Sequence, residues 1–168
     1  DLAAASVDVW LNDSLILDNF AFRTASPFVD VPAGVPLVVS ISGPTSIDTT
    51  TALAQFTYTL QADSSYILVA SGIVSPTGYA PATPFNIDVF GSAQEVSGSP
   101  TSTDVLVYHG STDAPIVDVF ESSVPVGTII DDISYSNFVG YAGFITADYT
   151  IQVRNSNNSS IVASYGAP

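Results

Sequence analysis

The sequence holds a single histidine, His109, and a serine and an aspartate follow it within four residues, Ser111 and Asp113. These are the three residue types of a hydrolase triad, in which the carboxylate orients the imidazole and the imidazole activates the hydroxyl. Neighbouring residues of one loop rarely converge on one reacting atom, and the chain lacks the Gly-x-Ser-x-Gly turn that exposes a nucleophilic serine. We therefore expect no catalytic residue. Instead, Ser111 and Asp113 should cap turn amides while the imidazole bonds to the backbone.

The aspartates suggest a second chemistry, calcium binding. Ca²⁺ takes about six to eight oxygen ligands from carboxylates and carbonyls that converge on one point. Asp104, Asp113 and Asp118 are candidates for such a set, and Asp131-Asp132 is the only adjacent pair of acids. No spacing matches an EF-hand loop or a repeat-type calcium turn. Acids solvated at the surface are the alternative, and that interpretation requires no cofactor.

Asp118 belongs to a triplet that occurs twice, as Val117-Asp118-Val119 and as Val7-Asp8-Val9 near the start of the chain. Alternating apolar and polar residues are typical of a half-buried strand, which turns one side chain into a core and the next outside. The two triplets are 110 residues apart, whereas three later pairs are 113 apart: Phe22 and Tyr135, Phe28 and Tyr141, and Val38 and Ile151. The sequence therefore predicts two copies of one unit, with a small insertion in the second copy within residues 121–132.

The run His109-Gly110-Ser111-Thr112-Asp113-Ala114-Pro115, with Val117-Asp118-Val119 after it, resembles the His-x-Ser-Pro-Asp-Ala-Pro-x-Val-Asp-Val-Tyr signature of the DUF4397 family. Thr112 departs from the usual proline, and the first copy lacks the His-containing part. The resemblance covers most of the chain and implies immunoglobulin-like β-sandwich repeats of secreted and surface proteins. It implies no activity, since the family's function is unknown. The signature residues are then structural: His109, Ser111, Asp113, Pro115, Val117, Asp118 and Val119.

Strand-forming residues dominate, and no segment sustains a helical apolar stripe, so we expect an all-β fold. Short strands at regular spacing favour two tandem antiparallel sandwiches. The resemblance implies that these are of the immunoglobulin-like type. Residues 1–95 form the first and 104–168 the second, joined by a Gly- and Ser-rich linker over 96–103. The first copy is expected to lack its opening strand and the second its closing strands, which leaves open sheet edges. Strands are predicted near 5–11, 14–18, 26–31, 35–42, 51–60, 64–74, 85–90, 104–109, 115–121, 124–130, 133–136, 139–145, 148–154 and 160–165.

The charge of the chain restricts its partners. Sixteen acids stand against Arg23 and Arg154, for a formal net charge of −14. Such a field repels phosphate backbones and anionic lipid headgroups, so we expect no nucleic-acid partner. No apolar run approaches the ~18 residues that span a bilayer, so we expect no membrane insertion. The absence of cysteine means that the core must hold the fold without disulfides.

These observations favour a non-enzymatic structural or adhesive segment of a larger surface, filament or secreted protein, located outside the cell or on its surface. Its expected partners are other copies of itself or neighbouring domains, joined through sheet edges. A carbohydrate-binding accessory module of a secreted enzyme is the alternative, with Trp10 and the tyrosines as a stacking platform for glycans. A third hypothesis is an enzyme that uses His109.

Overall fold

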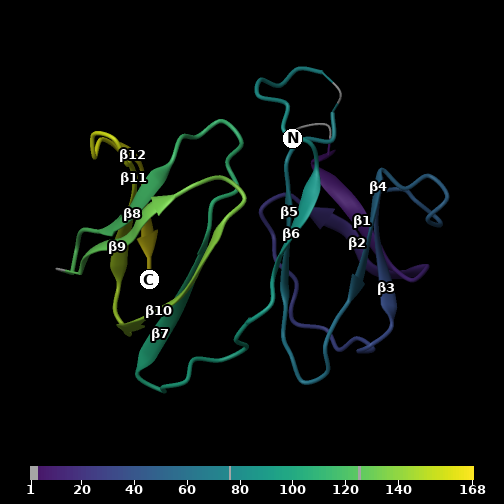
Figure 1. The fold of residues 1–168 in the computed structure, drawn as a ribbon, viewed down its shortest axis with the longest axis horizontal. Coiled ribbons are helices and arrows are strands. Elements are labelled where there is room, and N and C mark those ends of the chain that lie inside the picture. Colours follow the sequence, from purple (N-terminus) through teal and green to yellow (C-terminus); the bar gives the residue numbers. More distant parts are fainter. Residues whose placement is uncertain (1–3, 76, 125) are drawn as a thin grey trace. The chain divides into compact units, whose positions relative to one another are not determined.

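A computed structural model describes residues 4–75, 77–124 and 126–168 (Figure 1). The chain divides into two compact units, Asp1–Glu95 and Val96–Pro168, called unit 1 and unit 2 below. Among the described residues all regular elements of both units are strands, in antiparallel sheets, so the predicted all-β fold is confirmed. No helix in the described part of the chain is long and apolar enough to cross a membrane.

Unit 1 has a four-stranded sheet in the order β2-β1-β3-β4 and a separate β5–β6 hairpin (Figure 1). Its strands are β1 (Ser6–Leu11), β2 (Ser14–Ala21), β3 (Pro36–Ser42), β4 (Ala54–Thr59), β5 (Ile67–Ser71) and β6 (Asn86–Phe90). Alternation along β3 buries Val39 and Ile41, and Ile87 of β6 packs on them to complete the core. The hairpin therefore covers one face of the sheet.

Unit 2 has a four-stranded sheet in the order β9-β8-β11-β12 and a two-stranded sheet of β7 and β10. Its strands are β7 (Ser102–Tyr108), β8 (Val117–Glu121), β9 (Gly127–Ile133), β10 (Phe138–Ile145), β11 (Tyr149–Asn155) and β12 (Ile161–Ala167). Val117 and Val119 of the signature are buried with Ile130 and Ile133 of β9, and Val107 of β7 packs against this cluster.

The two four-stranded sheets are copies of each other, since β1, β2, β3 and β4 correspond to β8, β9, β11 and β12 in the same spatial order. Residues 12–13 connect β1 to β2, whereas residues 122–126 connect β8 to β9. The second connection is three residues longer and lies within the predicted window for the insertion. The same backbone hydrogen bond is present at the start of both connections. Asn12 N–H donates to Val38 O at 2.9 Å, and Ser122 N–H donates to Thr150 O at 3.0 Å.

The predicted correspondence between Val38 and Ile151 is wrong by one residue. Leu11 pairs with Val39, and Glu121, which is 110 positions after Leu11, pairs with Ile151. Val39 is therefore the counterpart of Ile151, and both pack into the cores of their units. Two adjacent valines at 38 and 39 made the register ambiguous in the sequence.

Three further predictions are corrected. Residues 26–31 form no strand: the matching segment of unit 2 is β10, which pairs with β7, and the described part of unit 1 has no counterpart of β7. Phe28 is consequently 46% exposed in a loop, whereas Tyr141 lies in β10.

Residues 134–137 form a turn rather than a strand, closed by the bond from Asn137 N–H to Ser134 O. The linker ends before Ser102, since Ser102 and Thr103 already pair with β10.

Candidate functional site

The signature loop is built around a buried histidine. His109 Nε2 lies 3.0 Å from Pro115 O, and because a carbonyl oxygen only accepts, Nε2 carries the proton. The backbone of His109 bonds to the turn after β9, with N–H donating to Asn137 O and O accepting from Ser136 N–H. The imidazole thus joins the two ends of its own loop.

Ser111 and Asp113 do not approach the imidazole as triad members. The hydroxyl of Ser111 donates to Asp113 Oδ1 at 2.8 Å at the surface, so the two side chains bond to each other. The hydrogen bond of the imidazole goes to Pro115 O, and the bond that joins Ser111 to Asp113 does not include the ring. This loop therefore has no acid–base relay.

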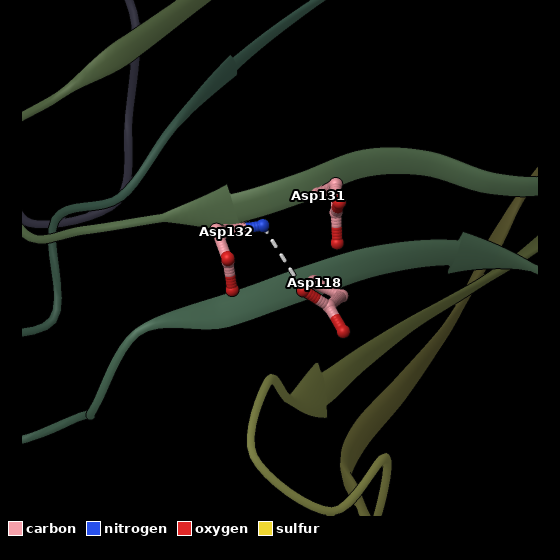
Figure 2. A group of neighbouring side chains, drawn as sticks. All are labelled: Asp118, Asp131 and Asp132. Carbon is pink, nitrogen blue, oxygen red and sulfur yellow. Dashed lines mark hydrogen bonds between the residues drawn. The ribbon is translucent and has the colours of Figure 1, made fainter.

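Asp118 lies at a β-bulge together with the Asp131-Asp132 pair (Figure 2). Val117 pairs with Ile133 and Val119 with Ile130, so two residues of β9 stand opposite Asp118. Asp132 has a left-handed backbone with φ of 56°, and its N–H donates to Asp118 Oδ1 at 3.0 Å. The three side chains each place one carboxylate oxygen within 4.8 Å of the others.

The predicted calcium set is not assembled. Asp104 lies on β7, where it pairs with Gly143, and Asp113 bonds to Ser111. Only Asp118 of the three candidates joins a group of acids close enough to hold an ion, and its neighbours are Asp131 and Asp132. The cluster has one half-buried and two exposed side chains, and it is the only group of that kind found among the described residues.

Unit 1 contains the same bulge and shows what the first acid does. Val7 pairs with Phe20 and Val9 with Leu17, so two residues of β2 stand opposite Asp8. Asn19 has a φ of 53°, and its N–H donates to Asp8 Oδ1 at 2.9 Å. An asparagine therefore occupies the position of Asp132, and the bulge forms with one carboxylate fewer. The aspartate that recurs in both units accepts a hydrogen bond from a backbone amide, and this contact explains its recurrence without a bound ion.

Asp8 also anchors the loop that covers the outer face of the unit 1 sheet. Ser46 donates to Asp8 Oδ2 from its hydroxyl at 2.7 Å and from its N–H at 3.1 Å, and it accepts from Trp10 Nε1 at 2.9 Å. The Asn19 amide first, and then the Ser46 hydroxyl, hold the pKa of Asp8 below its usual value against the opposing effect of burial. Trp10 is buried under this loop, so its ring is not an exposed platform.

The counterpart of Trp10 in unit 2 is Phe120, which has a different partner. The guanidinium carbon of Arg154 lies 3.5 Å from the centre of the Phe120 ring, a cation–π contact, and Gln152 Oε1 accepts from the same guanidinium. An aromatic residue beside an acid thus recurs in both units, with different neighbours around it.

Glu121 is a site residue that the sequence did not indicate. It stands at the position of Leu11, is 1% exposed, and accepts from Ser123 N–H at 2.7 Å, Ser123 Oγ at 2.6 Å and Val124 N–H at 2.9 Å. Thr150 N–H approaches the same carboxylate at 3.2 Å. Burial would raise its pKa, but these bonds outweigh burial and lower the pKa to about 2. The carboxylate therefore fastens the three-residue insertion to the sheet.

Unit 2 also has an apolar pocket of about 470 Å³. Its walls come from β7, β8, β9, β11 and the ends of β10 and β12, together with the residues that connect β10 to β11 and with Pro168. The main apolar lining residues are Val105, Val107, Val119, Ile129, Ile151 and Val153. Glu121 reaches the lining too, with its carboxylate already bonded to the inserted loop.

The match to a known family covers more than half of the chain. Residues 2–93 fit the family model described as "Domain of unknown function (DUF4397)". No curated protein and no solved structure matches this sequence. The matched range falls within unit 1, the unit that lacks the His-containing signature.

Proposed function

The chain belongs to the DUF4397 family, a family of unknown function, and on that premise we propose that it is a non-enzymatic structural or adhesive segment of a larger surface, filament or secreted protein. Its partners would be further copies or neighbouring domains that meet it through sheet edges. The proposed location is the cell surface or the extracellular space.

One observation carries the proposal: the polar residue that recurs in both units maintains the fold. Asp8 and Asp118 each accept the amide of a left-handed bulge residue on the next strand, Asn19 and Asp132. A recurring catalytic or ligand-binding residue would instead direct its charge into a cavity or toward a second functional group. Because the contact that recurs maintains the fold, it supports a structural role, in which the folded unit acts as a building block of a larger protein.

The signature loop supports the same role, because its only imidazole donates to a backbone carbonyl and its serine bonds to its own aspartate. The carbohydrate alternative depended on exposed aromatic rings, with Trp10 first among them. Trp10 is buried and its N–H is bonded to Ser46, so a sugar could not stack on it without displacing the loop.

Antibody labelling of the source cells tests the proposal. An antibody raised against the folded chain should label intact, unpermeabilised cells or their secreted fraction. An antibody against a cytosolic protein is the control, and it should label only permeabilised cells. Labelling that requires permeabilisation and is absent from the medium would contradict the proposed location and the structural role with it.

A further inference from the structure

Three of the seven asparagines begin an Asn-x-Ser sequence in which x is not proline: Asn12, Asn157 and Asn158. This sequence is the acceptor for N-linked glycosylation in secreted proteins. Serine is abundant in the chain, so the sequence pattern alone has low specificity. The surroundings of each side-chain amide distinguish the three asparagines, because the glycan is attached to Nδ2 and the folded chain must leave room for it.

The acceptor asparagines have side-chain nitrogens without hydrogen-bond partners. Three of the four other asparagines, Asn19, Asn86 and Asn137, each donate from Nδ2 to a neighbouring side chain at 2.6–2.9 Å. In the described part of the chain, the Nδ2 atoms of the three acceptor asparagines donate no hydrogen bond. A sugar linked to Nδ2 would therefore disturb a contact in the first group and none in the second.

Asn158 lies in the turn between β11 and β12 (Figure 1). Residues 157–160 of this turn are all exposed. The backbone orients the carbonyl end of the Asn158 amide, since Oδ1 accepts from Ser160 N–H at 3.1 Å. This bond brings the amide next to the residue whose hydroxyl completes the acceptor sequence. Among the described contacts Asn157 has no such bond to Ser159, so Asn158 is the better placed of the two.

Asn12 has the same acceptor sequence in a turn that holds it in place. Asn12 and Asp13 form the two-residue connection between β1 and β2, with left-handed φ of 45° and 63°. Asn12 Oδ1 accepts from Val38 N–H at 2.8 Å, and Asn12 N–H donates to Val38 O at 2.9 Å. A transferase would have to break both bonds to draw this asparagine into its active site. We therefore expect Asn12 to stay unmodified.

We propose that Asn158 is a site of N-linked glycosylation, with an oligosaccharide carried on a lipid phosphate as the donor. In the transfer, a bond forms between Nδ2 and the anomeric carbon of the first sugar, and the bond from that carbon to the phosphate oxygen breaks. The lipid phosphate leaves with the electron pair of that bond, and the amide gives up one proton to a base of the transferase. The inference rests on the proposed surface or extracellular location, because this modification belongs to secreted proteins. A bulky, polar glycan would keep this end of unit 2 hydrated.

Peptide mapping of the protein isolated from its source cells tests the proposal. Within this sequence trypsin cleaves only after the two arginines, so it separates Asn12 from Asn158. The peptide that begins at Asn155 should carry the mass of a glycan, and fragmentation should place it on Asn158. Residues 24–154 contain no Asn-x-Ser or Asn-x-Thr sequence and are the internal control, which should carry no N-linked glycan. An Asn155 peptide without a glycan on asparagine, or a glycan on Asn12 alone, would overturn the proposal.

Two substitutions expressed in the same cells make the test specific. Ser160→Ala removes the hydroxyl that completes the acceptor sequence of Asn158 and leaves that of Asn157 intact, so the glycan should be lost. Ser160 is exposed and bonds through its backbone, so the fold should be kept. Ser156→Ala is the matched control: it lies in the same turn, belongs to neither acceptor sequence and should keep the glycan. A glycan retained in Ser160→Ala, or lost equally from both variants, would overturn the assignment to Asn158. A chain that is labelled at the cell surface and carries no glycan would overturn this inference and leave the proposed location standing.

Discussion

At the residue scale, Glu121 replaces an apolar contact with a set of hydrogen bonds. Leu11 packs into the core of unit 1, whereas the carboxylate at the same position of unit 2 accepts four bonds from the inserted loop and from β11. Hydrogen bonds that favour the charged form lower a carboxyl pKa, and a difference in pKa between folded and unfolded chains makes stability depend on pH.

Glu121→Gln is predicted to make the free energy of unfolding of unit 2 depend less on pH in the acid range. The folded pKa of about 2 lies below the ordinary value of 4.5, so this stabilisation is present above pH 4.5 and is lost as the pH falls toward 2. Urea unfolding of the wild type should lose free energy over that range, with an uptake of up to about one proton on unfolding. The glutamine variant should lack that contribution. Equal pH slopes in both proteins would contradict the assignment, and Ser123→Ala should shift the acid transition to higher pH.

At the scale of elements, the β8–β9 bulge brings together three carboxylates where the β1–β2 bulge has two carboxylates and an amide. Asp132→Asn would make the second bulge like the first. It removes like-charge repulsion, and asparagine tolerates the left-handed backbone at this position. We expect unit 2 to be stabilised by about 0.2–1 kcal/mol, seen as a higher thermal midpoint. The difference from the wild type should shrink in high salt, because salt screens the repulsion that only the wild type retains.

Asp18→Asn in unit 1 is the matched control, and it should have a smaller effect because only one other carboxylate is nearby. The same two proteins also test whether the cluster binds calcium. If about 1 mM Ca²⁺ raised the midpoint of the wild type and not that of Asp132→Asn, the cluster would be a binding site of the strength found in extracellular modules.

Strand pairing explains which of these elements the sequence could predict. The Val-Asp-Val repeat and the change of offset from 110 to 113 located the insertion, since alternation and spacing are local properties. Residues 26–31 have strand-forming composition and form no strand, because a strand needs a partner that composition does not supply. The bonds from Asp8 to Asn19 and from Glu121 to its loop depend on a bulge and a turn, and neither is visible in a period-two pattern.

At the scale of the molecule, the two units differ in how completely their cores are filled. In unit 1 the β5–β6 hairpin covers the core face of the sheet. The loop that contains Ser46, which accepts a hydrogen bond from Trp10, covers the outer face. Unit 2 keeps an apolar pocket of about 470 Å³, and Tyr165 is exposed beside it. Apolar surface left in contact with water contributes nothing to stability, so unit 2 is expected to be the less stable unit.

Trp10 allows this difference to be measured, because it is the only tryptophan and it is buried in unit 1. On heating, far-ultraviolet circular dichroism should show a first transition in which tryptophan fluorescence does not change, as the sheets of unit 2 unfold. The fluorescence should change only in a second transition at higher temperature. If both signals changed in a single transition, the two units would unfold together, and the lower stability assigned to unit 2 would be refuted.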